Sequence, residues 1–153
     1  MIMVGFIAGY GYKDMFTSFD TDNILFQALS KSEKLKAAIS GGIYTTDRPD
    51  NSTKEDITIN TITVNGSMPQ RGTSNINIHV PDLKINISGQ EQRKADRERL
   101  RKISNMVISI LEPTIIDGLL FWVSNQIIIQ EKQINQHYTN LRIEWNICKS
   151  KNN

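Results

Sequence analysis

The residues of this sequence that could do chemistry are two histidines, one cysteine and one pair of adjacent carboxylates. A metal site or a general base would need His79 and His137 to converge with carboxylates, but His79 lies on the polar side of a predicted strand and His137 in a predicted hairpin loop. Glu55 and Asp56 lie at the edge of a predicted strand, where neighbouring side chains point to opposite faces. We therefore interpret both histidines as surface residues and predict no catalytic site.

The single cysteine, Cys148, can form neither an internal disulfide nor a cysteine-based zinc site. No recognisable motif surrounds it, so we expect a small buried or half-buried residue rather than a reactive thiol. The glycines in GFIAGYG, at residues 5–11, do not have the spacing of a phosphate-binding loop. The sequence thus predicts no metal site, no cofactor and no enzymatic activity.

The chain has 153 residues and a formal net charge of +2. This length suits one domain, and the near balance of charge argues against binding of nucleic acid or membrane by the whole surface. The first ten residues are apolar, but the run is short and interrupted by glycines, and no segment approaches the ~20 apolar residues of a membrane span. We predict an N-terminal extension or arm at residues 1–20, one domain at residues 21–148 and a frayed tail at residues 149–153.

Three predicted strands surround one long polar loop. Residues 75–80 alternate polar and apolar side chains, which is typical of a strand with one buried face, and residues 43–46 form a short strand-like run. Residues 56–64 change parity, so we predict a bulge near Asn60 and Thr61. The loop at residues 47–55 contains almost nothing that could be buried, which indicates exposure to solvent or to a partner.

Two helical regions flank these strands. The first follows a predicted N-cap at residues 20–23 and continues in a second piece at residues 33–39. The second and longest helix is predicted from residues 88–91 to about Leu111. Its first half carries six cations at Arg93, Lys94, Arg97, Arg99, Arg101 and Lys102. Because acidic residues are interleaved with them, we favour a solvated face with helical ion pairs, and a nucleic-acid-binding face is the alternative.

The C-terminal part predicts two further strands. Residues 119–123 form a continuous apolar run, which indicates a central strand buried on both faces, and Ser124 and Asn125 either turn or interrupt it before residues 126–130. Residues 139–148 alternate cleanly, after a hairpin loop at residues 131–138. Together the elements predict an α+β fold, with an antiparallel or mixed sheet of about five strands and two helices packed on one face.

The element order and several short patterns resemble the tail-completion proteins of tailed bacteriophages, also called tail terminators or neck ring proteins. The resemblance covers roughly residues 23–147. The patterns are AAISGGIY at residues 37–44, RP at 48–49, EDITIN at 55–60, NINIHVPD at 75–82 and YTNLRI at 138–143.

This resemblance implies a structural virion protein at the junction of head and tail, made in the bacterial host cytoplasm. Its copies would form a ring of six or more subunits that joins the portal or connector to the tail, and genomic DNA would pass through the lumen without sequence-specific binding. Its partners would be further copies and other phage neck or tail proteins, with no membrane and no cofactor.

Such ring contacts need two different complementary patches on each subunit. The loops at residues 47–55 and 67–74 are the candidates for subunit or neighbour-ring contacts. The predicted interface residues are Arg48, Asp50, Lys54, Glu55, Gln70 and Arg71. The alternative function is a small α+β nucleic-acid-binding module that uses a basic helix at residues 93–102, and a steep dependence of binding on salt would distinguish it.

Overall fold

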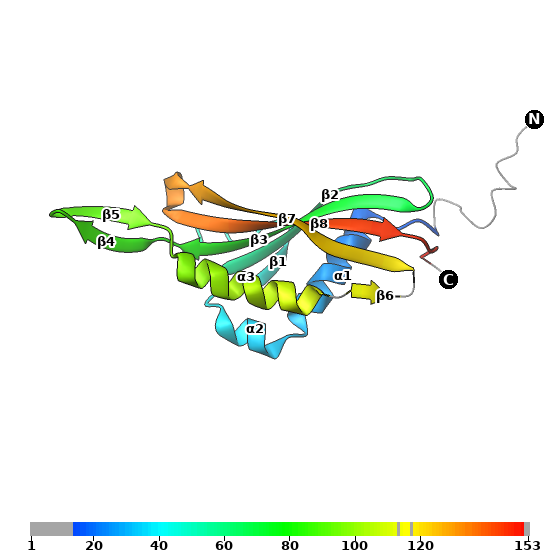
Figure 1. The fold of residues 1–153 in the computed structure, drawn as a ribbon, viewed down its shortest axis with the longest axis horizontal. Coiled ribbons are helices and arrows are strands. Elements are labelled where there is room, and N and C mark those ends of the chain that lie inside the picture. Colours follow the sequence, from blue (N-terminus) through cyan, green and yellow to red (C-terminus); the bar gives the residue numbers. More distant parts are fainter. Residues whose placement is uncertain (1–13, 113, 117, 152–153) are drawn as a thin grey trace, which may run out of the picture.

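A computed structural model describes residues 14–112, 114–116 and 118–151. A sheet forms the centre of the molecule, the helices lie on one of its sides, and one hairpin projects beyond it (Figure 1). The elements in chain order are α1 (Ser18–Ser30), α2 (Glu33–Ala38), β1 (Ile43–Thr45), β2 (Asp56–Val64), β3 (Gln70–Pro81), β4 (Leu83–Ile87), β5 (Gln90–Lys94), α3 (Arg97–Leu111), β6 (Thr114–Ile116), β7 (Leu119–Glu131), the short 3-10 helix η3 (Lys132–Ile134) and β8 (Gln136–Ile147).

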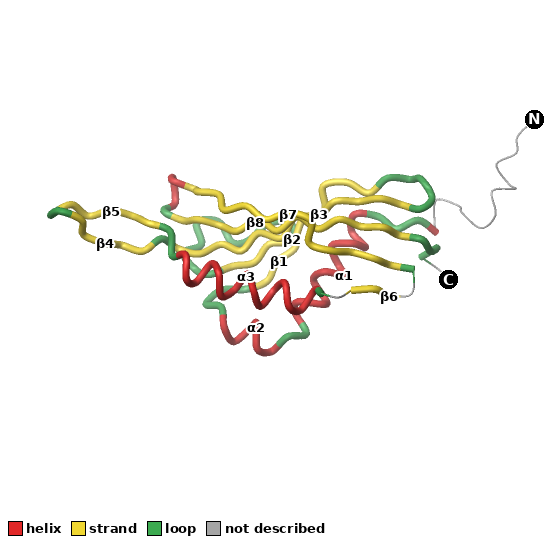
Figure 2. Tube along the Cα trace, viewed as in Figure 1, coloured by secondary structure: helices red, strands yellow, loops and turns green. Residues whose placement is uncertain are grey.

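The main sheet has the strand order β1-β2-β3-β8-β7-β6. Strand β1 is parallel to β2, and every other neighbouring pair is antiparallel. The sheet is therefore mixed, which is one of the two arrangements predicted from the sequence, antiparallel or mixed. The helices α1 and α3 contact the sheet, α2 contacts both of them, and all three lie on the same side (Figure 2). These observations confirm the predicted α+β class.

The central strands β3 and β8 supply much of the core. Their register pairs Ile76 with Leu141, and the apolar residues of both strands point toward the helices with almost no exposure. Both predicted strands are confirmed and are longer than the alternating runs that predicted them. From α3, Leu100, Ile103 and Val107 pack on this face at helical spacing.

The predicted bulge in β2 is confirmed. The pairing of β2 with β3 shifts between Thr61 and Thr63, which leaves Ile62 as the additional residue. The helix α1 docks at this position: the backbone N–H of Thr61 donates to Asp22 Oδ1 at 2.7 Å, and the hydroxyl oxygens of Thr61 and Thr21 are 2.8 Å apart. The bulge thus leaves a backbone donor free to bind the helix.

The start of α1 differs from the prediction. Thr17, not a residue within 20–23, is the N-cap, and its side chain forms a capping box with Asp20. The Thr17-x-x-Asp20 spacing was the signal in the sequence. The second helical piece is confirmed as α2, one residue shorter than predicted.

The predicted long helix from residues 88–91 is wrong in its first part. Residues 83–94 form the β4–β5 hairpin, and α3 begins only at Arg97 with Asp96 as its N-cap. Ser88 and Gly89 form the turn, both with positive φ angles. The hairpin extends beyond the main sheet (Figure 1), and its side chains are mostly exposed.

The predicted central strand at residues 119–123 is also corrected. It is the first part of β7, a 13-residue strand that continues through Ser124 and Asn125 with a second bulge. It is not buried on both faces, because β7 lies next to the edge of the sheet and most of its side chains are exposed.

The termini of the described chain meet. Phe16 belongs to the core, so part of the predicted extension at residues 1–20 is integrated in the fold, and residues 1–13 lie outside the described residues. The backbone N–H of Lys151 donates to Asp14 O at 2.8 Å, and Ser150 is buried. Residues 150 and 151 thus pack against the start of the described chain, while residues 152 and 153, the end of the predicted frayed tail at residues 149–153, lie outside the described residues.

Candidate functional site

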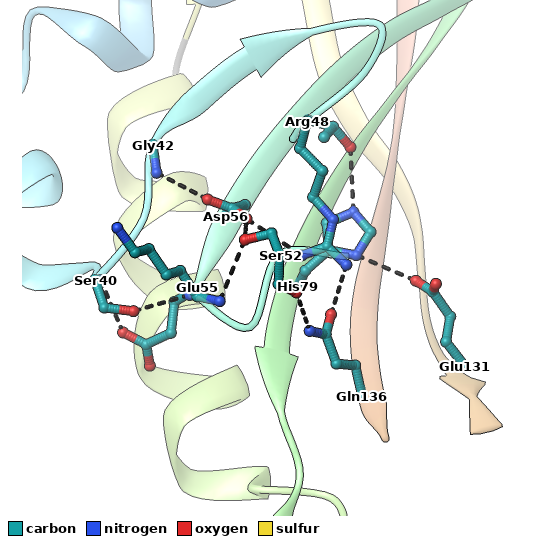
Figure 3. Close-up of polar contacts among 11 residues, drawn as sticks. Ser40, Gly42, Arg48, Ser52, Glu55, Asp56, His79, Glu131 and Gln136 are labelled. Atoms are coloured by element: carbon teal, nitrogen blue, oxygen red, sulfur yellow. Dashed lines mark hydrogen bonds and ion pairs between the residues drawn. The ribbon is translucent and has the colours of Figure 1, made fainter. Parts of the chain in front are cut away.

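The face of the sheet opposite the helices carries a polar cluster where the loop at residues 46–55 folds over β2. Asp56, almost completely buried at the start of β2, is its centre (Figure 3). Its carboxylate accepts hydrogen bonds from the backbone N–H of Gly42 at 2.9 Å, from Ser52 Oγ at 2.5 Å and from Arg48 Nη1 at 3.3 Å. A buried carboxylate requires such partners, and here they are drawn from the loop and from its flank.

Gln136, at the start of β8, joins the same cluster from the far side of β3. Its side-chain oxygen accepts from Arg48 Nη2 at 2.5 Å, and its Nε2 donates to Ser52 O at 2.6 Å. The guanidinium of Arg48 therefore bridges β2 and β8, and the loop is fastened at Arg48 and at Ser52. Gln136 was not among the predicted residues, because no local pattern relates it to a loop more than eighty residues away.

His79 lies beside this cluster and is buried, which corrects its interpretation as a surface histidine. Burial and, secondarily, the positive charge of Arg48 lower the pKa of His79 to about 4, although Asp56 acts in the opposite direction. Its Nε2 is 3.3 Å from Thr58 Oγ1, and its Nδ1 is 3.2 Å from Glu131 Oε1 without a hydrogen-bonding geometry.

A hydroxyl, an imidazole and a carboxylate in this order could suggest nucleophilic catalysis. The geometry does not favour that chemistry, because Thr58 is buried against the sheet and a histidine with a pKa near 4 is a weak base at neutral pH. The cluster instead provides hydrogen bonds that hold the loop at residues 46–55 on the open face. Next to it is a shallow, open depression lined by residues of the loop, β3 and β8.

Glu55 points the other way, toward the helices, as the strand geometry predicted. Its carboxylate accepts two hydrogen bonds from Arg99 on α3, each at 2.7 Å, and Arg99 also donates to Ala38 O at the end of α2. The hydrogen bonds that Arg99 donates to the Glu55 carboxylate raise the pKa of Arg99. The adjacent carboxylates thus fasten the loop to both sides of the sheet.

The six predicted interface residues do not form one patch. Arg48 and Glu55 are held in the contacts just described, and Gln70 is buried, with its side chain bonded to both backbone polar groups of Phe16. The other three, Asp50, Lys54 and Arg71, are exposed. The loop at residues 47–55 precedes β2 and the turn at 65–69 follows it, so the two predicted contact loops lie at opposite ends of that strand. Residues 70–74, predicted as loop, are the start of β3.

A second hollow lies between α3 and β7. Its volume is about 650 Å³, and residues of α3 form one wall and Gln126, Ile127 and Ile128 of β7 form the other. Ser104 lines it and is buried, but its Oγ has no hydrogen-bond partner among the described residues.

The predicted basic helix is divided by the fold. Arg93 and Lys94 belong to β5, and only the later cations lie on α3. Arg99 is paired with Glu55, and Arg101 forms an ion pair with Glu98. The cations therefore do not form one continuous helical stripe, and several of them are neutralised within the chain.

Other sites suggested by residue type are not formed in the described part of the chain. Its histidine, cysteine, aspartate and glutamate side chains include no group arranged to hold a metal ion. Cys148 is exposed rather than buried or half-buried as predicted. His137 is only partly buried, and its Nδ1 lies 2.6 Å from Asp82 Oδ1. None of the helices described is long and apolar enough to cross a membrane.

Comparisons with known proteins identify a structural likeness. No protein-family model matches the sequence, and no curated protein sequence matches it. Among solved structures, the fold is similar to that of a chain in the structure titled "Virion of native gene transfer agent (GTA) particle", with a TM-score of 0.52 and 10% sequence identity. The match covers 80% of this chain and 90% of that chain. At this identity the likeness concerns the fold.

Proposed function

We propose that this chain is a structural protein of a phage-like virion. It forms an oligomeric ring at the head–tail neck or at the head-proximal end of the tail, where it joins the connector to the tail and leaves a passage for DNA. The observation that carries this proposal is the likeness of the fold, over most of both chains, to a component of a gene transfer agent virion.

The polar cluster supports a structural role. Its charged groups are used to fix the loop at residues 47–55, and the histidine beside them is buried and neutral at physiological pH. A loop held in this way presents its remaining polar side chains, Asp50 and Lys54, in a defined position on the surface. Such preorganisation favours contact with another protein, because less conformational entropy is lost on binding.

The ring contact requires two different surfaces on each subunit. We place one at Asp50 and Lys54 and the other at Arg71, at the opposite end of β2. Arg48, Glu55 and Gln70 act indirectly, because they hold these loops in position. The nine residues of β2 separate the two ends by roughly 30 Å, so neighbouring copies can use them without mutual interference.

The test is the mass of the purified full chain by light scattering over a concentration series, with negative-stain imaging of large species. We expect closed rings, and we expect Lys54→Glu to lower the ring fraction. The matched control is Lys34→Glu, which makes the same charge reversal at an exposed position of α2. A chain that stays monomeric throughout and binds DNA with a steep dependence on salt would contradict the proposal.

A further inference from the structure

Among the residues that the structure describes, no strand pairs with the outer edge of β7 over most of its length. Strand β8 pairs with the whole of β7 on one side, whereas β6 covers only residues 119–121 on the other. Along residues 122–131, no strand of the described chain occupies the outer edge. Ile127 and Ile128, in the middle of this stretch, are 51% and 43% exposed. A long apolar edge of this kind is normally covered in a native protein, because it offers free hydrogen-bonding groups to any other strand.

The hollow beside α3 continues this edge. It lies between the outer part of β7 and α3, so a strand added to β7 would direct alternate side chains into it. Its volume of about 650 Å³ is sufficient for several apolar side chains. Ser104 of α3 lines the same space. Free backbone groups beside pockets for alternate side chains are the features of strand addition.

The sequence contains a segment that matches this site. Residues 1–13, MIMVGFIAGYGYK, are mostly apolar and include one charged residue and no proline. Extended, they span up to about 43 Å, and the ten uncovered residues of β7 extend for about 33 Å. We propose that residues 1–13 of a second copy of the chain add as a strand to the outer edge of β7 and fill the hollow beside α3.

The position of Asp14 favours a second copy over the same chain. Asp14 is bonded to Lys151, at the end of the sheet where β7 begins opposite Ile147. To reach its own uncovered edge, the segment would have to pass the ends of β8, β7 and β6 and then run along β6. With strands about 4.8 Å apart, that path uses about seven residues and leaves about six for pairing. The segment of a second copy can pair along its full length.

This inference goes beyond the proposed function, because it needs a second copy but no virion. The test is chemical cross-linking of two full-length copies, both carrying Cys148→Ser so that the exposed native thiol is removed. One copy carries Val4→Cys and the other carries Ile127→Cys together with a different affinity tag. A short bismaleimide can then link the two introduced thiols only between copies, and it tolerates uncertainty in strand register.

The matched control replaces Ile127→Cys with Ile62→Cys, which is similarly exposed at 55% but lies on β2. We expect several-fold more cross-linked heterodimer with Ile127→Cys, and loss of that excess when Ile128→Lys is added. Adding Phe19→Lys, at a more exposed position on α1, should leave the excess unchanged. Equal yields from residues 127 and 62 would overturn the inference.

A single chain that carries both Val4→Cys and Ile127→Cys distinguishes the two origins of the segment. If it links internally at high dilution while the mixed copies do not link, the segment binds its own chain and the inference is wrong. The result is also separable from the ring: a specific link without rings contradicts the proposed function alone, and rings without the link contradict only the strand addition.

Discussion

Arg99 connects three segments that are distant in sequence. Its guanidinium binds both carboxylate oxygens of Glu55 and the carbonyl of Ala38, and so ties α3 to the end of α2 and to the start of β2. The Arg99 and Glu55 side chains are only 29% and 14% exposed. An arginine pair of this geometry, partly removed from water, contributes more than a surface ion pair, because removing one partner leaves the other with unmade hydrogen bonds.

Arg99→Met should lower the free energy of unfolding by about 1–3 kcal/mol, measured by urea denaturation. The matched control is Arg101→Met on the same helix. It removes the ion pair between Arg101 and Glu98, whose side chains are both mostly exposed. We expect no clear change in stability for the control. Equal effects of the two substitutions would show that the hydrogen bonds between Arg99 and Glu55 contribute no more to stability than an exposed ion pair.

The buried histidine predicts a dependence of stability on pH. The pKa of His79 is about 4 in the folded chain against an ordinary value of 6.5, so between these values the unfolded chain binds a proton that the folded chain does not. Stability therefore falls as pH is lowered from 6.5 to 4. The contribution of His79 over this range is about 2–3 kcal/mol.

The measurement is urea denaturation of wild type and His79→Gln between pH 7 and pH 4.5. The difference in unfolding free energy between them should shrink as the pH falls, since His79→Gln lacks this proton uptake and the carboxylates titrate in both proteins. His137→Gln, at the partly buried histidine beside Asp82, serves as the control. Parallel pH profiles for wild type and His79→Gln would contradict the burial of a neutral imidazole.

At the residue scale, the sequence could predict which face each side chain of β3 occupies but not what covers that face. Alternation correctly assigns His79 to the face opposite the core. Its surroundings include Thr58 of β2 and the Tyr138 ring of β8, and neither is related to it by local spacing. The same limit explains why Arg48 and Gln70, predicted at an interface, are used within the fold.

At the scale of elements, the entry from α2 into β1 depends on close backbone packing at Gly41. Its N–H donates to Glu55 O at 2.9 Å, and a Cβ at this position would lie 1.9 Å from Asp56 Oδ1 and 2.5 Å from Glu55 O. The second of these contacts is with backbone at the start of β2, so it cannot be relieved by a side-chain rotation alone.

Gly41→Ala should therefore destabilise the fold by about 2 kcal/mol or more, because it displaces the junction that holds Asp56 in its cluster. Gly66→Ala is the control, since its Cβ would meet only the Met15 side chain at ordinary distances of 3.6 and 3.8 Å. Its effect should stay below about 1 kcal/mol. Thermal unfolding followed by circular dichroism measures both, and a tolerated Gly41→Ala would show that β1 is not fixed to β2 in this way.

Strands and helices with one buried face could be predicted from the sequence, whereas strands without a buried face could not. The alternation in residues 75–80 and 139–148 exists because one side of each strand packs against helices. The β4–β5 hairpin has no such side, so its Gln, Glu, Arg and Lys residues were read by their helix propensity, and the two-residue turn at Ser88 and Gly89 was missed. The bulge in β7 lies at Ser124 and Asn125, where the sequence left open whether the chain turns or the strand is only interrupted.

At the scale of the whole molecule, two features have no partner within the described part of the chain. One is the outer edge of β7, and the other is the β4–β5 hairpin, which extends beyond the main sheet with Leu83 and Ile87 exposed (Figure 1). Their presence is consistent with a subunit built for assembly, since isolated two-stranded hairpins are at best marginally stable in water. The sequence predicted the class of fold, but strand order depends on long-range pairing that no local pattern contains.

These differences predict a gradient of hydrogen exchange across the monomer. Strand β8 is paired on both sides, by β3 and β7, and carries buried core residues, so its amides should exchange only through global unfolding. The amides of β4 and β5 pair only with each other and are covered by little apolar surface, so they should open locally and exchange far faster. Exchange of the full chain, read by mass spectrometry of peptides under dilute conditions, measures both. Equal protection of the hairpin and β8 in a monomer would contradict this prediction. It would mean that the rest of the same chain stabilises the hairpin, so that the hairpin is not an unpartnered surface available to a second copy.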